Sequence, residues 1–336
     1  ERIRPLRVDP AALTCCGGTN IMEMVAEKRL AADRSRMCIV MNAGSGKRDV
    51  AQTPEQVRSA LKNCGIEFDM RVVKSGAEIA STAQQALEDG CRTIVAAGGD
   101  GTISAVASVL QGSDATMGIL PLGTFNYFAR SLDIPVDIPA AVRLLAEGVS
   151  RPVRIASIND RIFLNNASLG AYPAILKTRE DIYRKWGRSR MAAYWSVLVA
   201  LATLRKPLHF IIETEDKVLE RRTPLIFAVN NAFQLEQVGL EGRDEIAAGR
   251  LALFIAPDTD RWGMLGNAVL LALGLAQRNQ TFDMIGAKSV RIRDGERSYD
   301  VACDGERSKM PAPYDLQVYE EKLSVIVPES RQGDLR

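Results

Sequence analysis

The sequence predicts a doubly wound α/β domain followed by a mainly antiparallel β-sandwich with inserted helices. Before Gly148, short apolar runs alternate with longer amphipathic patterns, which is typical of right-handed βαβ units and a parallel sheet. After Gly148, short β-branched runs are joined by polar two-residue turns such as Asn159-Asp160 and Glu215-Asp216, which is typical of antiparallel sheets. The chain has 336 residues and is 46% hydrophobic, which is enough to bury two cores.

These patterns divide the chain into four parts. Residues 1–36 are predicted to form an N-terminal extension, 37–150 the α/β domain, 151–328 the β-sandwich domain and 329–336 a tail. We place the boundary between the domains near residues 148–152, where the spacing of apolar residues changes.

The α/β part is expected to contain four strands with helices between them. The strands are expected at residues 37–42, 68–73, 93–97 and 117–121. Thr53-Pro54-Glu55-Gln56 is a capping box with proline at the first helical position, so it predicts a helix that ends at Asn63. A second helix is expected over 77–89, and a third follows Thr102.

The second part is expected to consist of short strands and two apolar helices. The strands are expected at residues 153–158, 161–167, 209–214, 217–222, 225–230, 250–255, 289–293, 299–303, 316–319 and 323–327. The helices, 191–204 and 264–276, are too short to span a bilayer. They could cover the sandwich core, or the first, with basic residues on both sides, could meet an anionic membrane surface.

Composition excludes several classes of function. The net charge of +2 gives no overall case for nucleic-acid binding. The chain has a single histidine, His209, which excludes a metal site built from several histidines and argues against a Ser-His-Asp catalytic triad. The N-terminal residues carry no apolar secretory segment, so the cytosol is the expected compartment, with peripheral contact at the inner face of the membrane as a separate hypothesis.

The segment Gly98-Gly99-Asp100-Gly101-Thr102 stands between a predicted strand and a predicted helix. Glycines let backbone approach a ligand closely, and the start of the following helix favours phosphate. Asp100 supplies the oxygen ligand that Mg²⁺ prefers. An ordinary strand-turn-helix junction would explain the same residues, so this segment alone does not distinguish a phosphate-binding loop from a structural turn.

Two further segments follow predicted strands in the same way. They are Asn42-Ala43-Gly44-Ser45-Gly46-Lys47 and Leu122-Gly123-Thr124-Phe125-Asn126. In open α/β sheets, ligands bind at the carboxyl ends of the strands. All three segments are therefore expected to face one ligand.

These motifs, taken in order, resemble the catalytic core of the diacylglycerol kinase and sphingosine kinase superfamily, in its soluble bacterial lipid-kinase branch. The resemblance rests on Asn42–Gly46, Gly98–Thr102, Pro121–Arg130, Ile162–Gly170 and Asp304-Gly305-Glu306, and it covers residues 37 to 328. It implies ATP-dependent phosphorylation of a lipid hydroxyl, with a diacylglycerol-like acceptor favoured and the oligomeric state left open.

The resemblance also implies roles for individual residues. Asp100 would act through Mg²⁺, and Glu306, with Asp304, would take the proton of the acceptor hydroxyl. The residues expected to contact the nucleotide are Asn42, Ser45, Gly98, Gly99, Asp100, Gly101, Thr102, Ile103, Ser104, Thr124 and Asn126. From the residues alone, Asp304-Gly305-Glu306 could equally be an exposed turn.

The sequence departs from the family pattern in its second part. The family often carries Asp-Gly-x-Leu-Asp near a structural Mg²⁺ site, where this chain has Ala248-Gly249-Arg250-Leu251-Ala252, so both aspartates are replaced by alanine. Arg307 and Lys309 add positive charge close to Glu306, where they could hold an anionic group or could simply be solvated.

Other functions remain open from the sequence. An NAD kinase or phosphofructokinase shares Gly-Gly-Asp-Gly, although residues 121–130 match the lipid-kinase pattern. A sphingoid-base kinase and a non-catalytic protein that binds nucleotide or lipid are further alternatives. A dehydrogenase is disfavoured because Ser104 stands at the third glycine position of GxGxxG.

Overall fold

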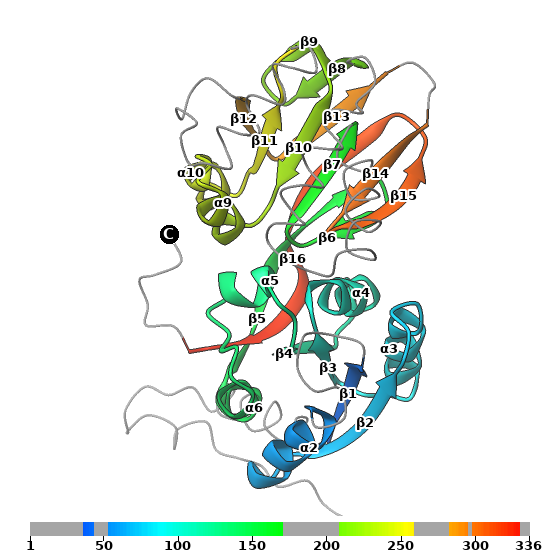
Figure 1. Ribbon diagram of the computed structural model, residues 1–336, viewed down its shortest axis with the longest axis vertical. Coiled ribbons are helices and arrows are strands. Elements are labelled where there is room, and N and C mark those ends of the chain that lie inside the picture. The colour runs from blue at the N-terminus through cyan, green and yellow to red at the C-terminus, as the bar shows by residue number, and fades with distance from the viewer. Residues whose placement is uncertain (1–35, 44–52, 171–207, 259–281, 295–297, 330–336) are drawn as a thin grey trace, which may run out of the picture.

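The structure is a computed structural model that describes residues 36–43, 53–170, 208–258, 282–294 and 298–329 (Figure 1). It contains a mixed sheet with helices in its N-terminal part, followed by an antiparallel part, so the predicted fold class is confirmed. The predicted helices 191–204 and 264–276 lie outside the described residues. Among the residues described, no helix is both long and apolar enough to span a bilayer.

Four parallel strands form the N-terminal sheet in the order β2-β1-β3-β4. They span Arg36–Asn42 (β1), Glu67–Val73 (β2), Thr93–Gly98 (β3) and Thr116–Pro121 (β4), close to the predicted ranges. Successive residues of β1 face opposite sides of the sheet, as strand geometry requires. Met37 and Ile39 therefore enter one core, and Cys38 and Val40 enter the other.

Helices cover both faces of this sheet. Helices α2 (Thr53–Asn63) and α6 (Ile138–Glu147) pack on the side of Met37, and α3 (Glu78–Glu88) and α4 (Asp100–Leu110) pack on the side of Cys38. The short helix α5 (Tyr127–Ser131) follows β4. Since β3 runs directly into α4, the segment from Gly98 to Thr102 lies at the carboxyl end of the sheet.

The remaining strands form a sandwich, most of which lies above helices α2 to α6 in Figure 1. One layer continues the N-terminal sheet through β16 (Tyr314–Val327), β13 (Ser289–Arg293), β8 (Leu208–Thr214) and β9 (Val218–Thr223), with β5 (Val149–Ile158) and β6 (Arg161–Phe163) beside β16. The other layer contains β12 (Asp283–Ala287), β11 (Leu251–Ile255), β10 (Leu225–Val229), β7 (Asn166–Gly170), β14 (Tyr299–Cys303) and β15 (Glu306–Met310). Helices α9 (Ala232–Val238) and α10 (Arg243–Ala247) cover part of the second layer.

The core of the sandwich lies between these two layers. Phe163, Phe210 and Tyr314 from the first layer pack in one buried cluster with Leu169 and Ile226 from the second. All five side chains are almost fully shielded from water. Apolar burial of this kind is the main source of stability of such a pair of sheets.

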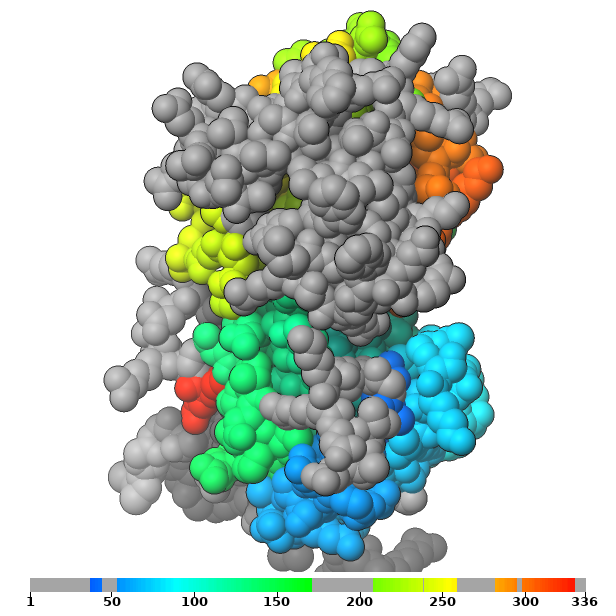
Figure 2. Space-filling model, viewed as in Figure 1, coloured from blue at the N-terminus to red at the C-terminus, as the bar shows by residue number. Residues whose placement is uncertain are grey.

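Strand β16 joins the two parts of the molecule. Its first half pairs with β13 and β5, and Ser324 and Val325 near its end pair in parallel with β4. The ranges 316–319 and 323–327, which we expected as two strands, are one strand with an irregularity between Tyr319 and Leu323. In Figure 2 the red C-terminal end of this strand lies beside the green residues of the α/β part. The sheet is therefore continuous across the predicted domain boundary, which falls within β5.

Candidate active site

At two positions, the loops after β3 and β4 have no room for a Cβ atom. A Cβ atom on Gly98 would lie 2.3 Å from the Thr102 Oγ1 atom, and one on Gly123 would lie 2.5 Å from the Gly99 Cα atom. The loops after β3 and β4 thus touch through glycine, as expected if both strand ends face one ligand. The first amides of a helix have no carbonyl partner within it, so the start of α4 is suited to an anionic ligand.

Alanine at position 123 is expected to separate these loops. The added methyl group would collide with backbone, which cannot rotate away as a flexible side chain can, so we expect a loss of about 1–3 kcal/mol in the free energy of unfolding together with weaker ATP binding. Thermal unfolding and ATP titration measure the two effects. Gly76→Ala is the matched control because a Cβ at Gly76 meets nothing within 4 Å; equal behaviour of the two variants would contradict the packing argument.

Asn126 fixes the shape of the loop after β4. It adopts a left-handed backbone conformation with φ of 54°, and its side chain is 3% exposed. Its Oδ1 atom accepts a hydrogen bond from the Gly123 amide at 3.0 Å, and its Nδ2 atom donates to the Gly123 carbonyl at 3.1 Å. The side chain that we expected at the nucleotide thus holds the loop, while Thr124 and Phe125 lie exposed at its tip.

Asp100 forms a second contact between the loop after β3 and the segment after β4. Its carboxylate accepts a hydrogen bond from the Phe128 amide at the start of α5, at 3.4 Å. Burial raises the pKa of Asp100, and the nearby carboxylate of Asp304 raises it further, while the backbone amides around Phe128 oppose the shift. A partly buried carboxylate next to a helix start that favours anions is poised to bind a cation.

The end of β1 also reaches this region. The Nδ2 atom of Asn42 lies 3.4 Å from the Thr102 Oγ1 atom, to which it donates a hydrogen bond. Thr102 and Ile103 are buried, so Ile103 contributes its side chain to the core rather than to a ligand. Ser45 lies outside the described residues. Three strand ends therefore meet, as the sequence predicted for parallel strands.

Asp304 lies in the turn between β14 and β15. Asp304 and Gly305 both have positive φ, 48° and 87°, as a two-residue hairpin turn requires. The Asp304 carboxylate accepts hydrogen bonds from three consecutive amides, residues 164–166, at 2.8, 2.8 and 3.1 Å. It also accepts one from the Ser104 Oγ atom of α4 at 2.6 Å. Asp304 therefore ties the sandwich to the helix that follows the glycine loop.

Asparagine at position 304 is expected to break this tie. Its amide nitrogen would face backbone N–H groups that need an acceptor, and a buried donor without a partner costs about 1–3 kcal/mol. We expect D304N to unfold at a clearly lower temperature than Ser104→Ala, which removes one bond only and leaves no orphaned backbone donor. A D304N melting temperature equal to that of the wild type would show that the four bonds carry little stability.

Glu306 follows this turn as the first residue of β15. Its side chain is 60% exposed, and its Oε2 atom lies 2.8 Å from the Nη2 atom of Arg161. Its Oε1 atom is 3.9 Å from the place that a Cβ atom of Gly101 would take. The carboxylate therefore faces the first turn of α4. We did not predict Arg161 as a site residue, because its partner is 145 positions away in the sequence.

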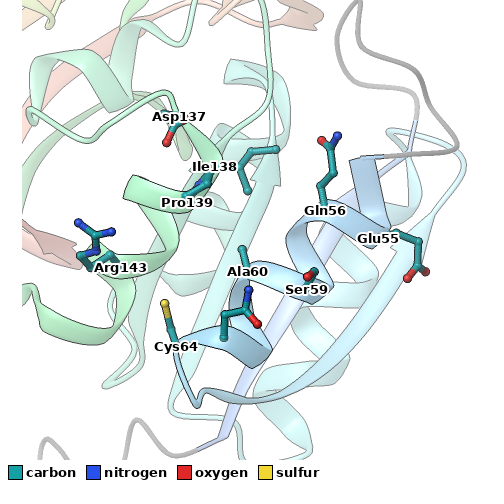
Figure 3. A pocket seen from close by; sticks show the side chains of 10 residues that line it. Glu55, Gln56, Ser59, Ala60, Cys64, Asp137, Ile138, Pro139 and Arg143 are labelled. Carbon is teal, nitrogen blue, oxygen red and sulfur yellow. The ribbon is translucent and has the colours of Figure 1, made fainter.

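A separate cavity lies away from these residues. It has a volume of about 1170 Å³ and is lined by residues of α2 and α6 and by residues next to these helices, among them Gln56, Cys64 and Arg143 (Figure 3). These helices cover the face of the sheet opposite α4. Of the predicted site residues that the structure describes, none lines this cavity.

The loop after α10 does not suit the structural metal that the resemblance implies. At positions 248 and 252 it has alanine, and Arg250 forms an ion pair with Glu245 at 2.6 Å. The Arg154 guanidinium donates a hydrogen bond to the Ile246 carbonyl. A second guanidinium group thus lies at this loop, where two aspartates would be needed to attract a cation.

Comparison with known proteins agrees with the motifs. Residues 36–158 match the family described as diacylglycerol kinase catalytic domain, so the predicted resemblance is confirmed for this part of the chain. "Probable lipid kinase YegS-like" from Klebsiella pneumoniae is 38% identical over 128 residues, 37% of this chain and 43% of that protein. A protein named diacylglycerol kinase from Staphylococcus saprophyticus is 33% identical over 139 residues, 41% of this chain and 46% of that protein. In these alignments the chain spans a little under half of its relatives' length.

The fold has a counterpart over nearly its whole length. A crystal structure described as that of a diacylglycerol kinase from Bacillus anthracis superimposes with a TM-score of 0.67 at 20% identity, covering 88% of this chain and 98% of that one. At this identity the likeness establishes the shared fold only.

Proposed function

We propose that this protein is an ATP-dependent lipid kinase, which transfers the γ-phosphoryl group of ATP to a lipid hydroxyl, with a diacylglycerol-like acceptor favoured. The observation that carries the proposal is the placement of the Glu306 carboxylate over Gly101, in the first turn of α4. A phosphate at this turn and a carboxylate next to it are the two parts that transfer to an alcohol requires.

The nucleotide phosphates fit the start of α4. The glycine packing at Gly98, Gly99 and Gly123 leaves backbone where a side chain would otherwise stand, and the helix start favours negative charge. Gly101, Thr102 and the exposed Thr124 border the same region. Ser104 supports it indirectly, because its hydroxyl holds Asp304.

Asp100 is the residue that would hold Mg²⁺. Magnesium in such sites is bound by one or two carboxylates together with the phosphates, so a single aspartate next to the phosphate-binding turn suits the ion. When bound, the ion neutralises charge on the phosphates. The burial of Asp100 strengthens its attraction to a cation, since neighbouring water no longer screens the charge.

Glu306 is assigned the role of general base. It takes the proton of the acceptor hydroxyl while a bond forms between the acceptor oxygen and the γ-phosphorus atom. The bond from the γ-phosphorus to the bridging oxygen breaks, and its electron pair leaves with ADP. Asp304 acts in this scheme by placing Glu306, because its carboxylate is already engaged by four hydrogen bonds.

A panel of acceptors tests the proposal. Terminally labelled ATP is incubated with the protein and, in turn, a short-chain diacylglycerol, a sphingoid base, an undecaprenol-like alcohol and NAD, and each product is identified by mass spectrometry. Label on the diacylglycerol is the expected result. Label on NAD alone, or on none of the acceptors despite ATP binding, would contradict the lipid-kinase proposal.

A lipid acceptor requires contact with a membrane surface. The basic residues that first suggested such contact flank residues 191–204, outside the described residues. Phe125, 55% exposed and stacked on Tyr127 at 5.3 Å between ring centroids, supports contact in the described part of the chain. We propose peripheral binding at the inner face of the membrane by a cytoplasmic protein. Co-sedimentation with anionic vesicles at low salt tests it, and the absence of binding would count against it.

A further inference from the structure

An ion pair joins the two layers of the sandwich beside the start of α4. Arg161 opens β6 in one sheet, and Glu306 opens β15 in the other. Their nearest atoms, Nη2 and Oε2, are 2.8 Å apart. The other carboxylate oxygen faces Gly101, so one carboxylate separates the guanidinium of Arg161 from the turn that we assign to the nucleotide phosphates.

The backbone that carries Arg161 is firmly held. Arg161 pairs with Ile158 across a two-residue turn. In this turn, Asn159 donates its amide to the Asp315 carbonyl at 2.7 Å, and its Oδ1 atom accepts from the Asp315 amide at 2.8 Å. The side chain of Arg161 is 33% exposed. The backbone that carries the guanidinium is thus fixed, and the paired N–H donors of a guanidinium match two oxygens of a phosphate group.

Stability alone does not explain this ion pair. Glu306 is largely exposed to water, and exposed ion pairs contribute little to folding. The Arg161 guanidinium meets the Glu306 carboxylate, whose other oxygen faces the first turn of α4. A positive charge at this point would meet the outermost phosphate of a bound nucleotide.

We propose that Arg161 binds the transferred phosphoryl group of ATP, a step that rests on the proposed function. Before ATP binds, Arg161 holds Glu306 over α4. When the phosphates arrive, the guanidinium donates hydrogen bonds to γ-phosphate oxygens, and Glu306 is released to accept the proton of the acceptor hydroxyl. The guanidinium of Arg161 offsets the charge on the γ-phosphoryl group while this group passes to the acceptor oxygen and ADP leaves.

Nucleotide binding gives the first test, because Arg161 would contact only the γ-phosphate. Arg161→Met is compared with the wild type for affinity to ADP and to a non-hydrolysable ATP analogue, both with Mg²⁺. The analogue should bind about tenfold more weakly, and ADP should bind unchanged. Arg243→Met is the matched control, since Arg243 forms an exposed pair with Glu236 at 2.7 Å. Equal loss of both nucleotides, or no loss of either, would overturn the proposal.

Turnover gives the second test. Arg161→Met should lower kcat by about 10²-fold at an unchanged melting temperature, and Arg161→Lys should restore part of it, because lysine keeps the charge without the planar fork. Wild-type turnover in both variants would overturn the proposal. If the wild type binds ATP but phosphorylates no lipid, the proposed function fails, while the nucleotide comparison still decides the role of Arg161.

Discussion

Replacing Glu306 with glutamine is expected to lower turnover by about 10²–10⁴-fold, the usual contribution of a general base. Glutamine has nearly the same shape and can still accept a hydrogen bond from Arg161, but it cannot take the acceptor proton at neutral pH. The side chain is 60% exposed, so the fold should tolerate the change. Steady-state kinetics with ATP and the acceptor identified in the panel measure the effect.

ATP binding separates a chemical role of Glu306 from a structural one. E306Q should bind ATP about as tightly as the wild type, since the proposed base contacts the acceptor and not the nucleotide. Glu321→Gln, at an exposed glutamate of β16, is the control and should leave turnover unchanged. Undiminished turnover in E306Q would remove Glu306 from the mechanism.

Replacing Asp100 with asparagine is expected to raise the Mg²⁺ concentration that turnover requires and to remove most of the activity, a loss of about 10²-fold or more. Asparagine keeps an oxygen that can accept from the Phe128 amide, so the contact between the loops survives. What disappears is the negative charge. Titration with Mg²⁺ at fixed ATP, for both proteins, measures the effect. Saturation of D100N with Mg²⁺ at wild-type concentrations would contradict the assignment.

The stability of D100N should change in the opposite direction from its activity. Burial raises the pKa of Asp100 in the folded protein, so the folded state disfavours the charged form. The wild type without nucleotide therefore loses part of its stability as pH rises through the pKa of Asp100, and D100N lacks this loss. At neutral pH we expect D100N to melt no lower than the wild type. A markedly lower melting temperature would indicate a structural role.

The sequence was most informative where local patterns decide the structure. Strands β1 to β4 and the glycine loop follow from apolar runs and glycine positions, which act over a few residues. β15 was not predicted, because Glu306-Arg307-Ser308-Lys309-Met310 is polar. Within the described part of the chain it is an edge strand, paired with β14, and charged side chains are common on edge strands because they discourage pairing with another chain.

The candidate site was only partly predictable, because its hydrogen bonds and its ion pair connect residues that are far apart in the sequence. Asp304-Gly305 indicates a tight turn from its composition, but nothing near it in the sequence names the amides of residues 164–166 or Ser104 as its partners. Asn126 and Asp304 were expected to act on ligand or substrate, and in the structure both side chains bind backbone. Arg161 gives no local pattern at all. Its position becomes visible only when β6 and β15 are placed in opposite sheets.

A single-turnover experiment tests the central claim, that the start of α4 and Glu306 form one site for phosphoryl transfer. Excess protein is mixed with terminally labelled ATP, Mg²⁺ and a short-chain diacylglycerol, and the label is followed in ATP, lipid and inorganic phosphate. We expect the wild type to move the label to lipid within one turnover, and E306Q to hold the same amount of bound ATP with its label in place. Release of the label as inorganic phosphate by the wild type, or equal transfer to lipid by both proteins, would contradict the account.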